Sequence, residues 1–200
     1  MSSRKIAKAA SAANGRAKDR HIEAGLSDVL SEFARAMATD FPIQGILDHL
    51  VAQIVDILPI TGAGVTLISP SSEPRYVAAS SPHAMRFEQL QTELAEGTCL
   101  PSYHTGESVS VPDLRSDHRF GTFCPSVLAA GLAAGFAFPL RHGQSRLGAL
   151  DLYRNAAGPL PPDPTSAAQT LACRGRLVLF RAQAPTRTPT ECRRGVSPIS

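Results

Sequence analysis

The sequence predicts an α+β domain in which helices cover both faces of one antiparallel sheet. Two pairs of strand-like segments, at residues 61–80 and 134–153, are each joined by a tight turn, which is typical of antiparallel neighbours. Segments with helical periodicity flank and separate these hairpins. The length of 200 residues suits one such domain with short extensions, because a single core closes at roughly 100–150 residues.

Two amphipathic helices are expected before the first strand. Apolar residues recur with helical spacing over residues 22–38 and again over residues 43–58. Pro42 suits the first turn of the second helix, and Pro59 ends its apolar run.

The first hairpin is expected in residues 61–80, with a Pro-Ser-Ser-Glu-Pro turn at residues 70–74. Helical spacing returns over residues 83–96, and Gly97 closes that helix. A loop is expected over residues 97–106.

The second half of the chain alternates in the same way. A short strand is expected at residues 108–111, and a short helix at residues 119–130. The second hairpin, residues 134–153, turns at residues 141–144 and carries the strongest hairpin signal. Asp163-Pro164 is an N-cap and first-turn pair that opens the last helix.

Charge divides the chain into three parts. Residues 1–20 carry six basic side chains against one acidic, and so do residues 174–200, whereas residues 21–173 carry 15 acidic against 8 basic. Each extension also has few large apolar side chains, so we expect a disordered basic arm, a folded domain and a mostly disordered Arg/Pro-rich tail. An acidic body with basic extensions is not the profile of a nucleic-acid-binding domain.

Several classes of protein are not expected. The longest apolar runs reach about half of the ~20 residues that a membrane span needs, and the N-terminus lacks a secretory apolar core. We therefore expect a cytoplasmic protein with no membrane partner. Cys99, Cys124, Cys173 and Cys192 form no CxxC pair and no zinc-spaced cluster, so reduced thiols are expected and a metal site is not.

Two segments carry a resemblance to a known family. EGTCLPSYHTGESVSVPDLRSDHRF at residues 96–120 and GFAFPLRHGQSRLGALDLYR at residues 135–154 resemble GAF domains, and the likeness spans about residues 24–172. It is most similar to the sensory half of bacterial regulators that pair a GAF domain with an RNA-binding ANTAR module. That family usually reads Gly-Pro-Cys where this chain has Gly-Thr-Cys at residues 97–99.

The resemblance implies a fold, a function and partners. The fold is PAS-related, with five or six antiparallel strands in an order near 2-1-5-4-3, a ligand pocket on one sheet face and a helix-mediated dimer on the other. The function is sensory or regulatory and non-enzymatic, through a small-molecule effector, in signal transduction or transcription (antitermination) control. Residues 174–200 have too few apolar positions for an ANTAR module, so RNA is an expected partner only if another chain supplies one.

The pocket is expected beneath the segments that cross over between strands, because loops held by a rigid sheet are where recognition usually occurs. The expected lining residues are Cys99, Tyr103, Asp113, Phe120, Phe123, Phe136 and Phe138 on the roofed face, with Asp151 at the sheet. Aromatic residues at such spacing also form plain core, and a pocket filled by the protein's own side chains is the alternative. Asp113 also suits a cap of the turn after Pro112.

No cofactor is expected. The Asn-Lys pair of cyclic-nucleotide-binding GAF domains is absent, since no lysine follows Lys18. The histidines lie in polar turns or at helix ends, which does not favour haem. A bilin would need a thiol near Arg and His, and Cys124 beside Phe123 shows no such neighbours.

The alternative within the same fold is a free methionine-(R)-sulfoxide reductase using Cys99 and Cys124. The Gly-Val-Cys-Gly stretch of those enzymes resembles residues 97–100, and their resolving cysteine falls in the region of Cys124. Their Leu-Asp-Ile-Asp motif keeps only Asp151 here, and the acid expected before the next strand motif is absent from residues 135–140. We therefore expect a buried, inert Cys99.

A homodimer is also expected. The helix at residues 22–38 and the helix from Pro164 should lie together on the face opposite the pocket, where Leu171 and residues 177–180 add apolar surface. The alternative is that these helices cover only their own sheet.

Overall fold

The computed structural model describes residue 17, residues 20–29, residue 31 and residues 43–69 and 72–183. Its centre is a five-stranded sheet in the order β2-β1-β5-β4-β3, in which every neighbouring pair is antiparallel. The strands are β1 (Gly62–Ser69), β2 (Ser72–Ala79), β3 (Val109–Val111), β4 (Ala134–His142) and β5 (Ser145–Arg154). This confirms both expected hairpins and the expected strand order.

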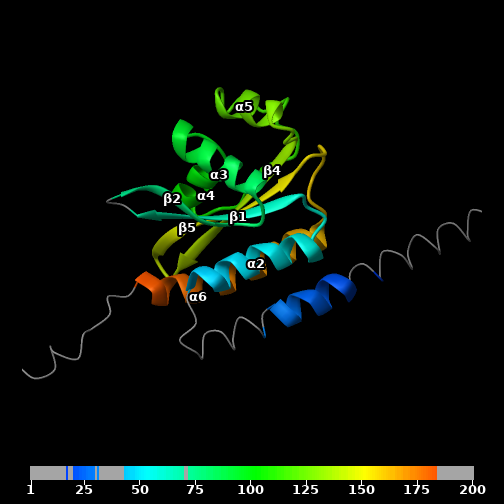
Figure 1. Cartoon of the computed structure of the whole chain (residues 1–200), viewed down its shortest axis with the longest axis vertical. Coiled ribbons are helices and arrows are strands. Elements are labelled where there is room, and N and C mark those ends of the chain that lie inside the picture. Colours follow the sequence, from blue (N-terminus) through cyan, green and yellow to red (C-terminus); the bar gives the residue numbers. More distant parts are fainter. Residues whose placement is uncertain (1–16, 18–19, 30, 32–42, 70–71, 184–200) are drawn as a thin grey trace, which may run out of the picture.

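Helices cover both faces of the sheet, as Figure 1 shows. The face that we call the α2/α6 face carries α2 (Ile43–Ile57) and α6 (Pro162–Gln183). The opposite face, the α3/α4 face, carries α3 (Pro82–Leu94), α4 (Cys99–Thr105) and α5 (Phe123–Ala129). The architecture is therefore α+β, as expected, with one layer of helices on each side.

Side chains along β1 alternate between the two faces of the sheet, and this alternation explains how the faces differ. Ala63 and Val65 join the large apolar core on the α2/α6 face. Gly62 and Gly64 alternate with these residues and have no side chain, so bare backbone faces α3. The approach is close, because a Cβ on Gly62 would lie 3.2 Å from the Cβ of Ala84. A glycine-lined strand lets a helix pack closely against it.

Phe136 and Phe138 lie on the other face from the one expected. Both belong to the core on the α2/α6 face, where Leu171 of α6 is also buried. Successive side chains of a strand point to opposite faces, so Ala137 between them pairs with Asp151 on the α3/α4 face. The expectation that these two phenylalanines share a pocket face with Asp151 is wrong, because it would break the alternation.

Within residues 97–106, where a loop was expected, Cys99–Thr105 form helix α4. Pro101 stands in its first turn, where a missing backbone N–H has no cost. Gly106 ends the helix with φ of +73°, and its N–H donates to the Ser102 carbonyl. At the other end of the domain, α6 runs past residue 173 to Gln183, into the segment expected to be a tail.

Only part of the first expected helix falls within the described residues. Residues 20–29 are helical, Val29 is buried in the core, and Ile22 and Leu26 pack against that core. The rest of the expected helix lies outside the described residues, and so do nearly all of the expected arm and residues 184–200. Within the described part of the chain, no helix has the length and hydropathy needed to cross a bilayer.

A substitution at the end of α3 tests the fold. Ala95 is exposed and has a left-handed φ of +49°, a conformation that the Cβ atom disfavours. We expect Ala95→Gly to raise the free energy of unfolding by about 1 kcal/mol in urea titrations. Ala52→Gly, on the exposed side of α2, is the control and should lower it by about 1 kcal/mol. Destabilisation by both changes would contradict the left-handed cap.

Candidate functional site

A closed polar network occupies the middle of the α3/α4 face. It consists of six side chains that are each at most 1% exposed: Thr66, Glu88, Gln91, Thr98, Asp151 and Tyr153. They come from β1, α3, β5 and the residue before α4, so the network joins four parts of the fold. A buried polar group is tolerated only when it has partners, which makes the bonds within this network obligatory.

Glu88 is the centre of the network. Thr66 Oγ1 donates to one carboxyl oxygen at 2.5 Å, and the Tyr153 hydroxyl donates to the other at 2.6 Å. Gly64 makes room for the carboxyl group, because a Cβ there would lie 2.0 Å from Glu88 Oε1. Burial raises the pKa of Glu88 to about 7, and the two hydroxyl donors act against that rise.

Gln91 extends the network from α3 to the start of α4. Its amide nitrogen donates to the Tyr153 hydroxyl at 3.0 Å, and its oxygen accepts from the Cys99 backbone N–H at 3.0 Å. Gly97 lies against this amide with φ of +128°, and a Cβ at that position would come within 2.4 Å of Gln91 Oε1. The Gly-Thr-Cys sequence thus follows from the need to dock α4 on Gln91.

Asp151 is the second buried carboxyl group. Thr98 Oγ1 donates to its Oδ1 at 3.2 Å, whereas Oδ2 has no hydrogen-bond partner among the described residues, and neither has the buried Ser102 Oγ. Burial, followed by the nearby Glu88, raises the pKa of Asp151 well above its usual range. Burial therefore shifts both carboxyl groups toward their protonated forms.

Cys99 is buried, as expected. It is 1% exposed and packs with Ala137 and Ala149. Burial raises the pKa of its thiol well above the usual value, and the charges of Asp151 and Glu88 act in the same direction. A thiol in this environment remains protonated and is a poor nucleophile.

The remaining expected site residues divide between core and surface. Tyr103 is buried on α4, and Phe120 and Phe123 meet edge to face with ring centroids 6.4 Å apart. Asp113 accepts from the backbone N–H and the side chain of Arg115, which lowers its pKa, and it caps the turn as the alternative interpretation proposed.

A cavity of about 190 Å³ lies beside α5, and we call it the α5 cavity. Its lining combines apolar and polar side chains: Leu114, Arg115, Asp117, His118, Phe120, Gly121, Cys124, Pro125 and Leu128. The expectation that Cys124 lacks Arg and His neighbours is wrong, because the loop before α5 folds back over it. A bilin does not fit, since even drug-sized ligands occupy pockets of about 300–1,000 Å³.

Helix α3 holds α5 at both ends. The Glu96 carboxylate, just after α3, accepts from the backbone N–H groups of Thr122 and Phe123 at 2.8 and 3.0 Å. These bonds lower the pKa of Glu96. At the start of α3, His83 Nε2 donates to the Ala130 carbonyl at 2.8 Å. A displacement of α5 would therefore strain hydrogen bonds at both ends of α3.

Sequence reasoning missed Glu88, Gln91, Glu96 and Tyr153. One signal was available: Glu88 and Gln91 stand next to Phe87 and Leu90 on the inward side of a helix, where polar residues require partners. No group of three or more His, Cys, Asp or Glu within the described chain is arranged to hold a metal ion. The described cysteines Cys99, Cys124 and Cys173 are free thiols.

A protein-family model for the GAF domain matches residues 42–174. The chain belongs to the GAF domain family. The matched segment runs from the start of α2 into α6 and contains all six network residues, α5 and the whole lining of the α5 cavity. GAF domains are a sensory and regulatory fold, and this chain has that fold.

Solved structures agree on the fold at low sequence identity. The GAF domain of a phosphoenolpyruvate-protein phosphotransferase from Coxiella burnetii superposes with a TM-score of 0.65 at 13% identity, covering 80% of this chain and 95% of that one. The corresponding domain from Acinetobacter gives 0.62 at 16% identity, with 80% and 95% coverage. A free methionine-R-sulfoxide reductase from Neisseria meningitidis, in complex with its substrate, gives 0.59 at 15% identity, with 78% and 88% coverage. A search of curated proteins found no significant match.

The buried network predicts an unusual dependence of stability on pH. The native state binds a proton at Glu88 more tightly than the unfolded chain does, so the free energy of unfolding should fall as pH rises from about 4.5 to about 7. At ~1.4 kcal/mol per unit of pKa shift, Glu88 alone accounts for a fall of about 3 kcal/mol. Glu88→Gln keeps the shape of the side chain but cannot ionise, so its pH slope should be smaller.

Urea titrations at a series of pH values measure this slope. Glu93→Gln is the matched control, because Glu93 lies on the same helix but is exposed and paired with Arg86. The control should keep the slope of the wild type. Equal slopes in the wild type and Glu88→Gln would show that Glu88 does not carry the proton.

Proposed function

We propose that this chain is a non-enzymatic regulatory GAF domain that binds a small effector in the α5 cavity. One observation carries the proposal: the cavity with mixed lining lies against a helix whose two ends are held by α3. A ligand at α5 can thus change the position of the helix that carries Glu88 and Gln91. This is the arrangement that a sensory domain requires.

The lining suggests the chemistry of the effector. Phe120, Leu114 and Leu128 offer an apolar surface, while Arg115 and His118 provide polar groups at the exposed side. The cavity volume of about 190 Å³ limits the ligand to a small metabolite, below the usual size of a drug-like molecule. A planar apolar molecule with one polar edge fits these features.

Effector binding is transmitted through the contacts between α5 and α3. An effector that favours one position of α5 shifts the population of the bonds at Glu96 and His83, and with them the position of α3. Because α3 reaches β1 and β5 through the polar network, the change is passed to the central strands. In this proposal, the output is signal transduction or antitermination control. The RNA-binding module is supplied by another chain, and the protein is cytoplasmic.

The environment of the thiols supports the non-enzymatic part of the proposal. Burial raises the pKa of Cys124, and the charges of Asp117 and Glu96 raise it further, whereas Arg119 opposes them. Cys99 is also held protonated and lines neither described cavity. A sulfoxide reductase needs a thiolate nucleophile that substrate can reach, and neither cysteine combines both properties.

A homodimer forms part of the same proposal. The helix at residues 20–29 lies on the side of α2 and α6, and it leaves Ile22 and Leu26 only partly buried against the core. A second copy across a two-fold axis would complete their burial.

Native mass spectrometry of the full chain purified from its natural host tests the effector site. We expect a bound small molecule that is released on denaturation. Gly121→Leu should reduce its occupancy about tenfold, because a Cβ at Gly121 meets nothing within 4 Å and a larger side chain can enter the cavity without strain. Ala129→Leu, on an exposed part of α5 outside the cavity lining, should retain the molecule.

Two results would count against the proposal. Equal occupancy in Gly121→Leu and the wild type would place the ligand outside the α5 cavity. Turnover of free methionine-(R)-sulfoxide with a dithiol reductant, lost in Cys99→Ser, would establish the reductase alternative instead.

A further inference from the structure

A second cleft, of about 280 Å³, lies between β4, α6 and the turn that follows α4. We call it the α6 cleft. It exists because β3 pairs only with residues 135–137 of β4, whereas β4 continues to His142 alongside β5. Within the part of the chain that the structure describes, the edge of β4 beyond Ala137 therefore has no neighbouring strand, and Pro139 on that edge has no N–H to offer one.

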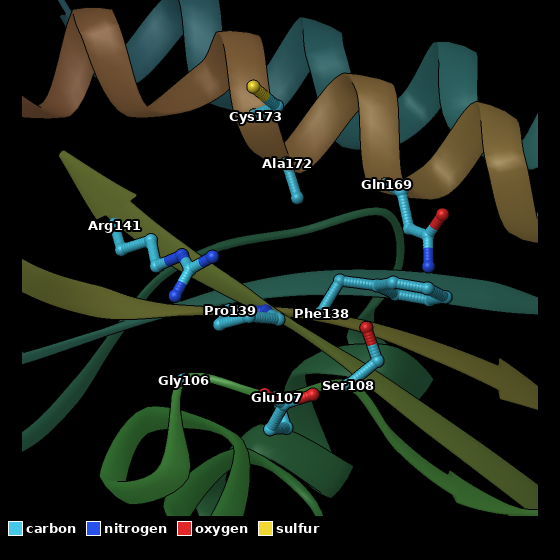
Figure 2. A pocket seen from close by; sticks show the side chains of 9 residues that line it. All are labelled: Gly106, Glu107, Ser108, Phe138, Pro139, Arg141, Gln169, Ala172 and Cys173. Carbon is cyan, nitrogen blue, oxygen red and sulfur yellow. The ribbon is translucent and has the colours of Figure 1, made fainter. Parts of the chain in front are cut away.

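The exposed surface of the cleft is mostly polar, and two apolar rings lie among the polar groups. Figure 2 shows the Phe138 ring and Pro139 between α6 and the turn of residues 106–108. The Gln169 amide approaches the Phe138 ring from α6, and the Ser108 hydroxyl approaches it from the opposite side. The Arg141 guanidinium lies over Pro139. A ligand on these two rings would meet hydrogen-bonding groups on three sides.

The cleft lining carries one arginine and one glutamate, and a second arginine lies close by. Arg141 faces Arg146 across the β4–β5 hairpin, and Arg146 donates to the His104 carbonyl. Glu107 is the one acidic side chain in the lining. A Cβ at Gly106 would lie 3.4 Å from Arg141 Nη1, so the guanidinium lies close to the turn after α4. A guanidinium has five donors in a planar fork that matches a carboxylate, so it can bind one in addition to other contacts.

We propose that the α6 cleft binds a small organic acid whose carboxylate contacts Arg141 and whose apolar chain lies on Phe138 and Pro139. A polar substituent on the chain would reach Gln169 and Ser108. The volume suits a molecule of few heavy atoms, because larger ligands occupy about 300–1,000 Å³. This site lies on the α6 side of the sheet and does not depend on the effector proposed for the α5 cavity.

Titration of the ¹⁵N-labelled full chain with sodium 4-methylpentanoate, followed by NMR, tests the site. We expect saturable shifts of the backbone amides of residues 106–108 and 140–141 and of the Gln169 side-chain amide. Arg141→Gln should weaken binding about tenfold or more, as expected for loss of hydrogen bonds to a charged group. Arg86→Gln, an exposed arginine of α3 outside both cavities, is the matched control and should bind as the wild type does.

Arg141→Lys keeps the charge without the fork and should give an intermediate affinity, which keeps the test valid if Arg141→Gln fails to fold. The neutral isostere 4-methylpentanamide should not bind. The same shifts with sodium chloride or sodium acetate at equal ionic strength would indicate an adventitious ion only. That result, unchanged binding in Arg141→Gln, or an absence of saturable shifts would overturn the proposal.

Discussion

The carboxyl group of Glu88, buried over the bare backbone of Gly64, is the interaction on which the α3/α4 face depends. It accepts from Thr66 on β1 and from Tyr153 on β5, so it holds α3 across the two central strands. Removing either hydroxyl would leave a carboxyl oxygen buried without that donor, which is more costly than the loss of an ordinary surface bond. The position of α3 in turn fixes Gln91, and through Gln91 the start of α4.

The same interaction determines where a ligand can bind. The network fills the middle of the sheet face on which the family resemblance implied a pocket. The α5 cavity lies at the margin of that face, and α3 connects this cavity to the network through Glu96. The buried side chains of the network therefore occupy the centre of the sheet face, and a ligand in the α5 cavity would lie beside them.

The sequence predicts the sheet well because its signals are local. Turns, prolines and alternation are encoded within a few residues, and they correctly indicate both hairpins and, with the resemblance, the strand order. Helix α4 was missed because it is only seven residues long, too short for a helical periodicity to stand out. Phe136 and Phe138 were assigned to the wrong face because side chains alternate along β4. Ala137, between them, lies opposite Asp151, so the two phenylalanines point to the other face.

The site was harder to predict because its contacts are distant in sequence. Tyr153 and Glu88 are 65 residues apart, and nothing near either residue indicates the other. The role of Gly64 is likewise visible only once α3 lies over it. A buried glutamate on an apolar helix stripe shows that a partner must exist, but only the topology shows which residues supply it.

Direct titration of the Glu88 carboxyl by ¹³C NMR, from about pH 3 to about pH 9 in the intact chain, tests the central claim. A midpoint near 7 is predicted, with Tyr153→Phe changing that midpoint because it removes one donor to the carboxyl group. A midpoint near the ordinary glutamate value of about 4.3, unaffected by Tyr153→Phe, would contradict the account by showing that Glu88 is neither buried nor bonded as described.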